Sequence, residues 1–222
     1  MDSAGIERAL VSSLTAVFRQ NVAECNEELR AALAPHRDRL IPLAVMNPGY
    51  PGWEADLSDC DDFAGIRLYP NYHGYHPVEA APLVQAAAEG GRPVFVAVRL
   101  QDERQHHPAC KVAAVGPESI VTLAKMVPSA RMVATMVRFG EAERLLECGN
   151  VWVDISGIQG PSGCIERLAS RFSGERLLFG SGIPLQYPLP NVMKLEMAHI
   201  SDDERKRIQH ENALRLAHIQ HN

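Results

Sequence analysis

The sequence has no paired-cysteine motif. Its five cysteines are widely spaced, and no two of them form a C-x-x-C pair. An odd number of isolated cysteines indicates neither a disulfide framework nor a zinc ribbon. We therefore expect free thiols at Cys25, Cys60, Cys110, Cys148 and Cys164.

Long apolar runs and clusters of basic residues are also missing. No apolar stretch reaches the length that spans a bilayer, and the N-terminus "MDSAGIERAL" lacks the basic and apolar regions of a signal peptide. The formal net charge is −5. These features give no electrostatic reason to expect a nucleic-acid or membrane partner, so we predict a cytoplasmic protein that binds neither.

The chain contains no linker, low-complexity tract or charge block, which predicts a single domain over residues 1–222. With 46% hydrophobic and 22% charged residues, it is long enough to bury one sizeable core. Seven short apolar runs, rich in β-branched residues, predict strands over residues 9–11, 41–45, 66–68, 94–98, 132–137, 151–153 and 177–179.

Helical segments alternate with these strands. Capping-box spacing at Asn21 with Glu24 and at Ser201 with Glu204 predicts two helix starts, and further helices are predicted over residues 77–89, 117–127 and 140–148. On the last helix we expect Ile208, Leu214 and Ala217 to be buried. Strict alternation of strand and helix predicts an α/β protein with a parallel sheet covered by helices.

Two architectures fit this alternation, a closed barrel and an open doubly wound sheet. No G-x-G-x-x-G follows the first strand and no P-loop follows any strand, which favours the barrel. Seven strands are one short of the usual eight, and residues 1–13 have the pattern of a helix tail that leads into a strand. We therefore predict a (β/α)8-type TIM barrel that is incomplete, with the first strand missing.

Several stretches together resemble consecutive landmarks of the amidohydrolase-related (amidohydrolase 2-like) family of metal-dependent hydrolases and decarboxylases. Their order and spacing match over nearly the whole chain. The resemblance implies a distorted (β/α)8 barrel with its active face at the C-terminal ends of the strands, and a divalent metal held by histidines and an aspartate. The stretches are "MDSAGIERALVSS", "FAGIRLYP", "GGRPVFVAV", "GNVWVDISG", "RLLFGSGIP" and "ISDDERKRIQHENALRLA".

The sequence departs from the family at the metal positions that can be compared. The H-x-H strand of the family would end before Met1, and the positions that match its later ligands hold Ala97, Met136 and Gly182. A methyl group and a hydrogen donate nothing to a divalent ion, and a thioether is a soft, weak ligand. We predict a degenerate metal site and no cofactor. A strand upstream of Met1 would not restore these three internal positions.

Two polar loops follow adjacent strands and are expected over the mouth of the barrel. "YPNYHGYHP" mixes aromatic faces with amide and imidazole groups, which suit a planar or sugar-like ligand. "RLQDERQHHP" offers groups for acid–base chemistry and guanidinium groups that bind a carboxylate. We predict Asp102, Glu103, His106 and His107 as catalytic, and Tyr69, Asn71, Tyr72, His73, Tyr75, Arg99, Arg104 and Asp154 as substrate-binding.

Structural explanations stand beside these assignments. The second loop could be a solvated connection, His73 and His76 could cap the helix at Pro77, and Asp154 could cap the backbone of "SGIQG". A rebuilt metal site is a further alternative, in which His106 or His107 would need His73, Asp102 or Glu103 as co-ligand.

Two functions from different classes follow. The first is a hydrolase or related C–C lyase that acts on a small polar molecule without the metal site of the family. The second is a non-catalytic descendant that binds a small molecule or a partner subunit. Because an open barrel exposes two sheet edges, we also predict a homodimer or larger assembly, or coverage of the gap by the N-terminal segment.

Overall fold

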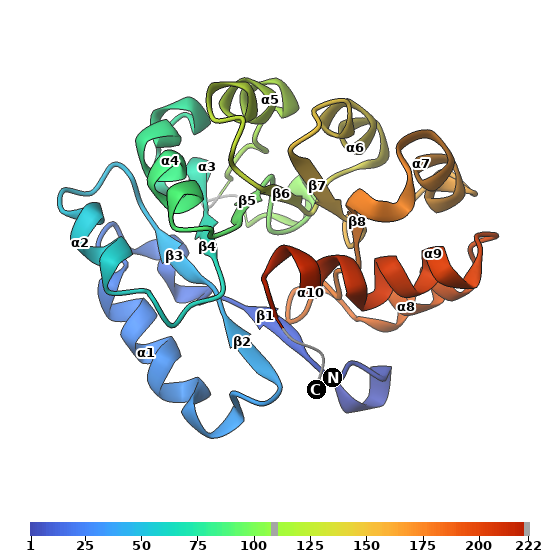
Figure 1. Cartoon of the computed structure of the whole chain (residues 1–222), viewed down its shortest axis with the longest axis horizontal. Helices are drawn as coiled ribbons and strands as arrows, with labels where there is room; N and C mark the ends of the chain where they lie inside the picture. Colours follow the sequence, from blue (N-terminus) through green and yellow to red (C-terminus); the bar gives the residue numbers. More distant parts are fainter. Residues whose placement is uncertain (108–110, 220–222) are drawn as a thin grey trace.

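Parallel strands surround the centre of the molecule, and helices cover their outer side (Figure 1). The computed structural model describes residues 1–107 and 111–219. Within these residues the strands are β1 (Ala9–Val11), β2 (Leu40–Pro42), β3 (Ala44–Met46), β4 (Ile66–Leu68), β5 (Val94–Ala97), β6 (Met132–Thr135), β7 (Val151–Asp154) and β8 (Leu177–Leu178).

The strands form two parallel sheets. β1 pairs with β2, and β3 to β8 form a six-stranded sheet in sequence order. Leu43 joins β2 to β3, and its backbone N–H donates to Val11 O at 2.7 Å while the next N–H donates to Gly65 O at 3.0 Å. The predicted strand 41–45 is therefore one bent strand that pairs first with β1 and then with β4. In the described part of the chain β1 does not pair with β8, so the barrel stays open along a line that we call the seam.

The pairing register fixes which side chains point into the barrel. Arg67 of β4 pairs with Phe95 of β5, which pairs with Val133 of β6. Paired residues of parallel strands share a face, and alternate residues along a strand return to that face. Tyr69 and Thr135 therefore lie one layer nearer the C-terminal ends of the strands. The opposite faces of the strands pack against the helices and form the main hydrophobic core.

The α-helices are α1 (Ala23–Leu33), α2 (Trp53–Ser58), α3 (Pro70–His73), α4 (Ala81–Glu89), α5 (Pro117–Met126), α6 (Phe139–Leu146), α7 (Cys164–Phe172), α8 (Leu189–Glu196), α9 (Asp202–Lys206) and α10 (Asn212–Leu216). Short 3-10 turns are η1 (Asp2–Ala4), η2 (Thr15–Phe18), η3 (Ala34–His36), η4 (Pro77–Ala80), η5 (Glu103–Gln105) and η7 (Gly174–Arg176), and η8 (Arg207–Glu211) is a π turn. No helix among the described residues combines the length and apolar character needed to cross a bilayer.

The C-terminal segment covers the free edge of β8. The predicted capping box at Ser201 is present, and its hydroxyl accepts from Glu204 N–H at 3.3 Å. Further along, Ile208 O accepts from Phe179 N–H at 2.8 Å, next to the end of β8. Leu216 packs with side chains of the barrel interior. The two ends of the described chain both reach the seam, since Ala4 and Ile219 line the same cavity.

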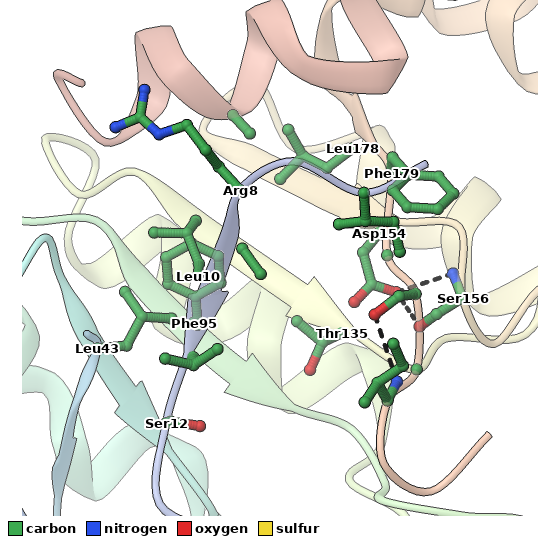
Figure 2. Close-up of a pocket in the computed structure, with 18 of the residues that line it drawn as sticks. Arg8, Leu10, Ser12, Leu43, Phe95, Thr135, Asp154, Ser156, Leu178 and Phe179 are labelled. Carbon is green, nitrogen blue, oxygen red and sulfur yellow. Dashed lines mark hydrogen bonds between the residues drawn. The ribbon is translucent and has the colours of Figure 1, made fainter. Parts of the chain in front are cut away.

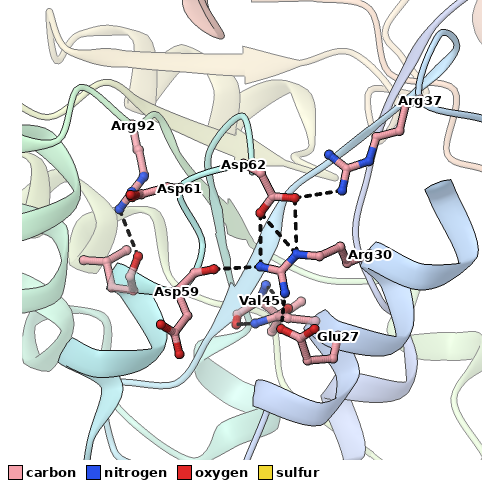
Figure 3. Close-up of polar contacts among 10 residues, drawn as sticks. Glu27, Arg30, Arg37, Val45, Asp59, Asp61, Asp62 and Arg92 are labelled. Carbon is pink, nitrogen blue, oxygen red and sulfur yellow. Dashed lines mark hydrogen bonds and ion pairs between the residues drawn. The ribbon is translucent and has the colours of Figure 1, made fainter.

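An ion-pair network near the N-terminal ends of the strands connects α1 to the loop before β4 (Figure 3). Arg30 donates to Asp62 at 3.0 Å and to Asp59 O at 2.7 Å, and it also pairs with Glu27. Arg37 reaches the same Asp62 carboxylate at 2.7 Å. These groups lie at the N-terminal ends of the strands, and in this architecture that end contributes to stability, whereas active sites lie at the C-terminal end. Cys25, Cys60, Cys148 and Cys164 are free thiols, and Cys110 lies outside the described residues.

Candidate functional site

A cavity of about 1200 Å³ occupies the barrel interior and continues along the seam (Figure 2). Small-molecule sites commonly have about 300–1,000 Å³. One end of the cavity, near the C-terminal ends of the strands, carries polar groups, and the other end combines apolar side chains with the charged side chain of Arg8. Figure 2 shows this arrangement, with Asp154, Ser156 and Thr135 on one side and Leu10, Phe95 and Arg8 on the other.

Asp154 is the last residue of β7 and lines the polar end. Its Oδ1 accepts three hydrogen bonds, from Ser156 Oγ at 2.6 Å, Ser156 N–H at 3.1 Å and Met136 N–H at 3.2 Å. Burial raises the pKa of this carboxyl above its ordinary value, and the hydrogen bonds from Ser156 and Met136 and the charge of Arg67 offset only part of the rise. The group therefore holds its proton to a higher pH than an exposed aspartate.

Arg67 brings a positive charge into the same cavity from the middle of β4. One terminal nitrogen donates to Thr135 Oγ1 at 2.9 Å, and the guanidinium lies over the ring of Tyr69, 5.4 Å from its centroid. Its Nε is buried and has no hydrogen-bond partner among the described residues. A buried donor without a partner costs free energy, and the guanidinium as a whole is half-buried, so it has hydrogen-bonding capacity left for a ligand oxygen that reaches it.

The Gly-Ser-Gly turn after β8 makes room for Asp154. A Cβ at Gly180 would lie 2.9 Å from Asp154 Cγ and 3.0 Å from Ser156 Cβ, closer than side chains tolerate. Two residues on, Gly182 has φ +72°, a conformation that glycine adopts without strain. This turn therefore supplies space and backbone geometry to the polar end of the cavity.

The remaining polar groups at this end are hydroxyls. Tyr69 is fully buried, and its OH lies 3.1 Å from the Oγ of Ser12, the residue that follows β1. Thr135 ends β6, because the next residue, Met136, has φ +59° and leaves the strand. Hydroxyl groups both donate and accept, so they suit the oxygen atoms of an organic ligand.

Of the twelve predicted site residues, Tyr69 and Asp154 line the cavity. Asp154 also accepts from the Ser156 backbone N–H. It therefore lies at the cavity, as a ligand-binding residue would, and also caps the backbone of the following loop. The other residues lie outside the cavity lining. Arg99 is engaged by Glu141 at 2.5 and 2.7 Å, and Arg104 by Asp102 at 2.7 Å. Arg104 also holds the pKa of Asp102 far below its ordinary value.

The first loop is tied mainly to the protein itself. His73 Nε2 lies 2.9 Å from Ala16 O, and burial lowers the pKa of this imidazole. The OH of buried Tyr75 has no partner among the described residues, and burial raises its pKa. Asn71 donates to Ala113 O, and Tyr72 is half-buried near Tyr69. His76, rather than His73, caps the turn that begins at Pro77.

In the second loop, Glu103 and His107 are exposed, while His106 is half-buried and its Nδ1 accepts from Val112 N–H at 3.4 Å. The catalytic roles of this loop stay predictions. Polar cavity residues that the sequence did not single out include Ser12, Arg67, Thr135 and Ser156 at the polar end and Arg8 at the other end. Arg67 had a usable signal, since it is a charged residue in the middle of an apolar strand.

The residues at the cavity do not fit a divalent metal. Ala97 is buried, Met136 contributes a backbone N–H and a thioether that contacts Ser156 Oγ, and Gly182 has no side chain. The one carboxylate at the polar end, Asp154, lies near the positive charge of Arg67. No three His, Cys, Asp or Glu side chains in the described ranges are grouped closely enough to hold a metal. A hard or borderline ion needs several such donors.

The family model for amidohydrolases matches residues 5–218. The chain belongs to the amidohydrolase family. Among curated proteins, no relative of this amidohydrolase-family chain is found by sequence. Solved structures with the same fold confirm the predicted TIM-barrel class.

These structures include decarboxylases, three of which follow. A 5-carboxyvanillate decarboxylase from Sphingomonas paucimobilis is 16% identical, with a TM-score of 0.78 over 99% of this chain and 81% of that one. A 2,6-dihydroxybenzoate decarboxylase from Rhizobium is 15% identical, with a TM-score of 0.77 over 99% and 86%. The enzyme from Novosphingobium aromaticivorans, solved with manganese and 3-methoxy-4-hydroxy-5-nitrobenzoic acid, is 19% identical, with a TM-score of 0.78 over 98% and 79%. At these identities the likeness shows a shared fold.

Proposed function

We propose that this amidohydrolase-family protein binds a small aromatic hydroxy acid in its barrel and decarboxylates it without a metal, as a C–C lyase. The observation that carries the proposal is that the Arg67 guanidinium and the Asp154 carboxyl line the same cavity, where burial raises the pKa of Asp154. The guanidinium can bind the acid group of a ligand, and the carboxyl can act as a proton donor. The decarboxylase activity of the structural neighbours adds to the case.

Decarboxylation requires few protein groups beyond the carboxyl of Asp154 and the guanidinium of Arg67. The neutral Asp154 carboxyl gives its proton to the ring carbon that bears the carboxylate, and the electron pair of the C–C bond returns to the ring as CO2 leaves. Asp154 then regains a proton from solvent. Arg67, Ser12 and Thr135 orient the oxygens of the acid. Hydrolysis would additionally need an activated water, and the hydrogen-bond partners that the described residues give Asp154, which are Ser156 and Met136, include no second base.

The first prediction tests the two residues separately. On a panel of hydroxybenzoates, Asp154→Asn lowers the rate of CO2 release by about 100-fold or more, because the general acid is lost. Arg67→Met mainly raises KM, because the anchor of the acid is lost. Activity falls as the pH rises through the raised pKa of Asp154, since the protonated form is the reactive one.

The matched control is Arg104→Met, which removes an equivalent charge from the exposed second loop and leaves CO2 release unchanged. Chelator treatment also leaves the rate unchanged. If CO2 release depends on added manganese, or if Asp102→Asn abolishes it while Asp154→Asn does not, the chemistry lies elsewhere and the proposal is wrong.

A non-catalytic binding protein is the second candidate. It is favoured by the three hydrogen bonds that Asp154 Oδ1 accepts from the protein, an arrangement also typical of a structural carboxyl. Calorimetric binding of an aromatic acid that depends on Arg67, together with no CO2 release from any acid of the panel, would decide for this second function.

A further inference from the structure

We infer that Lys194 of α8 is a positioning residue for Asp154: its ammonium group holds the loop after β7 and acts on the carboxyl through a single peptide group. This inference deepens the proposed function and rests on its assignment of Asp154 as the proton donor. Lys194 lies outside the cavity lining, so it acts on the site from behind the cavity wall and not by contact with a ligand.

One peptide group connects Lys194 to Asp154. Lys194 Nζ donates to the carbonyl oxygen of Ile155 at 2.7 Å. The N–H of the same peptide group belongs to Ser156 and donates to Asp154 Oδ1 at 3.1 Å (Figure 2). A positive charge at the carbonyl side of a peptide group polarises it, and its N–H becomes a stronger donor. Lys194 therefore strengthens a hydrogen bond that favours the ionised form of Asp154.

The charges around Lys194 direct its effect to Asp154. Burial lowers the pKa of Lys194, and the charges of Cys164 and Asp154 offset part of this effect. Burial raises the pKa of the Cys164 thiol, so this group is uncharged near neutral pH. Lys194 Nζ also donates to Asn191 Oδ1 at 2.8 Å, and two such short bonds to oxygen are typical of an ammonium group. Since Arg67 acts on Asp154 from β4, two cations influence one carboxyl.

The same helix also holds the turn on the other side of Asp154. Asn191 is buried, and its Nδ2 donates to Ser181 O at 3.1 Å. Ser181 follows Gly180, where a Cβ would lie 2.9 Å from Asp154 Cγ. Because Lys194 donates to Asn191, one connected set of hydrogen bonds fixes both the loop after β7 and the turn after β8. Loss of the ammonium group would loosen both segments that set the place of the carboxyl.

The first experiment measures the titration of Asp154 without any substrate. In the full chain labelled with 13C at the aspartate carboxyl carbons, NMR follows each carboxyl against pH, and Asp154→Asn identifies the resonance of Asp154. We expect Lys194→Met to move the midpoint of this titration to higher pH, because the ionised form loses its support. The apolar stem of lysine suits methionine at this half-buried position. Lys194→Arg keeps the charge and a donor, so it should bring the midpoint back toward that of the wild type.

The second experiment measures CO2 release by the same variants. Lys194→Met should lower kcat about tenfold at a pH where Asp154 is protonated, and leave KM unchanged because Arg67 still binds the acid. On the alkaline side the ratio of variant to wild-type rate should rise about threefold or more, since Asp154 of the variant keeps its proton to higher pH. The matched control is Lys125→Met, at an exposed position of α5, which should leave kcat, KM and the midpoint unchanged.

An Asp154 midpoint that is the same in the wild type and in Lys194→Met overturns the inference. A midpoint that moves equally in the methionine and arginine variants overturns it too, because the effect then does not depend on the charge. Both results leave decarboxylation by Asp154 in place. A midpoint that moves with methionine and returns with arginine supports the inference, and absence of CO2 release in that case removes only the lyase activity.

Discussion

The Arg99 guanidinium, expected to anchor a ligand, is committed to the protein itself. Its side chain is 6% exposed, and its terminal nitrogens bind both oxygens of Glu141 and the carbonyl of Met136. Glu141 also accepts from Arg138 N–H at the start of α6. Burial alone would raise the pKa of Glu141, but the hydrogen bonds from Arg99 and Arg138 hold it below the ordinary value. This buried pair joins the end of β5 to α6 next to the candidate site.

The second prediction follows from this pair. Glu141→Gln lowers the free energy of unfolding by about 1–3 kcal/mol at pH 7, because the buried guanidinium of Arg99 loses its counter-charge, while Glu141 itself is partly exposed. The stabilisation is present above the ordinary glutamate pKa and is lost as the pH falls through the lower pKa of the folded state. Urea unfolding at pH 7 and at lower pH therefore measures a difference in the free energy of unfolding between wild type and variant, and this difference becomes smaller on acidification.

Glu118→Gln is the control, since this carboxylate pairs with Arg144 on the surface. We expect a loss of less than about 1 kcal/mol there. Equal losses in the two variants, or a Glu141 effect that does not change with pH, would contradict the role given to the buried pair.

At single positions, the sequence indicated the chemical group that a residue carries, but it did not indicate the direction in which the side chain points. Tyr69 and Asp154 were found because each stands at the C-terminal end of a strand. Arg99 and Asp102 stand at similar places, but Glu141, distant in the sequence, takes up the charge of Arg99, and Arg104, two residues away, takes up that of Asp102. Ser156 and Thr135 are ordinary polar residues in sequence. Ser156 reaches Asp154 from the turn after β7, and Thr135 reaches Arg67 from the end of β6.

Secondary-structure elements were predicted well where their ends carry a signal. All seven apolar runs form strands, although the run at 132–137 ends at Thr135 because Met136 adopts a positive φ. α7 was missed, and it begins after Gly163 with no side-chain cap. On the last helical segment, Ile208 and Ala217 are buried as expected, but Leu216 is buried in place of Leu214. The π turn at η8 adds a residue to one turn and shifts the buried face.

The third prediction concerns the loop after β7. Gly157→Ala places a Cβ 2.5 Å from Met136 C, against backbone that has no room to move, and should lower the free energy of unfolding by more than about 2 kcal/mol. Because Met136 N–H holds Asp154, the variant should also weaken ligand binding. Thermal unfolding and titration with benzoate measure the two effects.

The matched change is Gly140→Ala in α6, where no atom lies within 4 Å of the added Cβ. It should raise stability by up to about 1 kcal/mol, because alanine favours the helix. If the Gly157 variant is as stable as the Gly140 variant, the loop at Gly157 and the loop at Met136 are not packed as closely as described.

For the whole molecule, apolar side chains gather on one exposed segment. Leu189 and Met193 are four residues apart on α8, and Met197 follows at the same spacing, which places them on one side of the helix. The loop before α8 adds Ile183, Leu185 and Tyr187, the last of which is 88% exposed. Clustered apolar exposure is typical of an interface, and it supports the predicted homodimer.

The fourth prediction tests this assembly. Light scattering of the wild type should give the mass of a dimer, and the double variant Met193→Lys, Met197→Lys should give that of a monomer, since charge cannot be buried in an apolar contact. Met126→Lys, at an exposed methionine of α5, should remain a dimer. A monomeric wild type would end the homodimer prediction. The cytoplasmic location and the single domain remain predictions as well.

The open seam has a consequence for the width of the barrel. In a closed barrel, the number of strands and their stagger set the radius. Since the ladder from β1 round to β8 is not completed in the described residues, and β2 and β3 belong to different sheets, no ring of hydrogen bonds holds the interior to one diameter. The bond from Ala64 N–H to Pro42 O at 3.0 Å is what ties the end of β2 to the segment before β4. We therefore expect the width of the interior to vary more than in a closed barrel, so that one set of walls can accept ligands of different thickness.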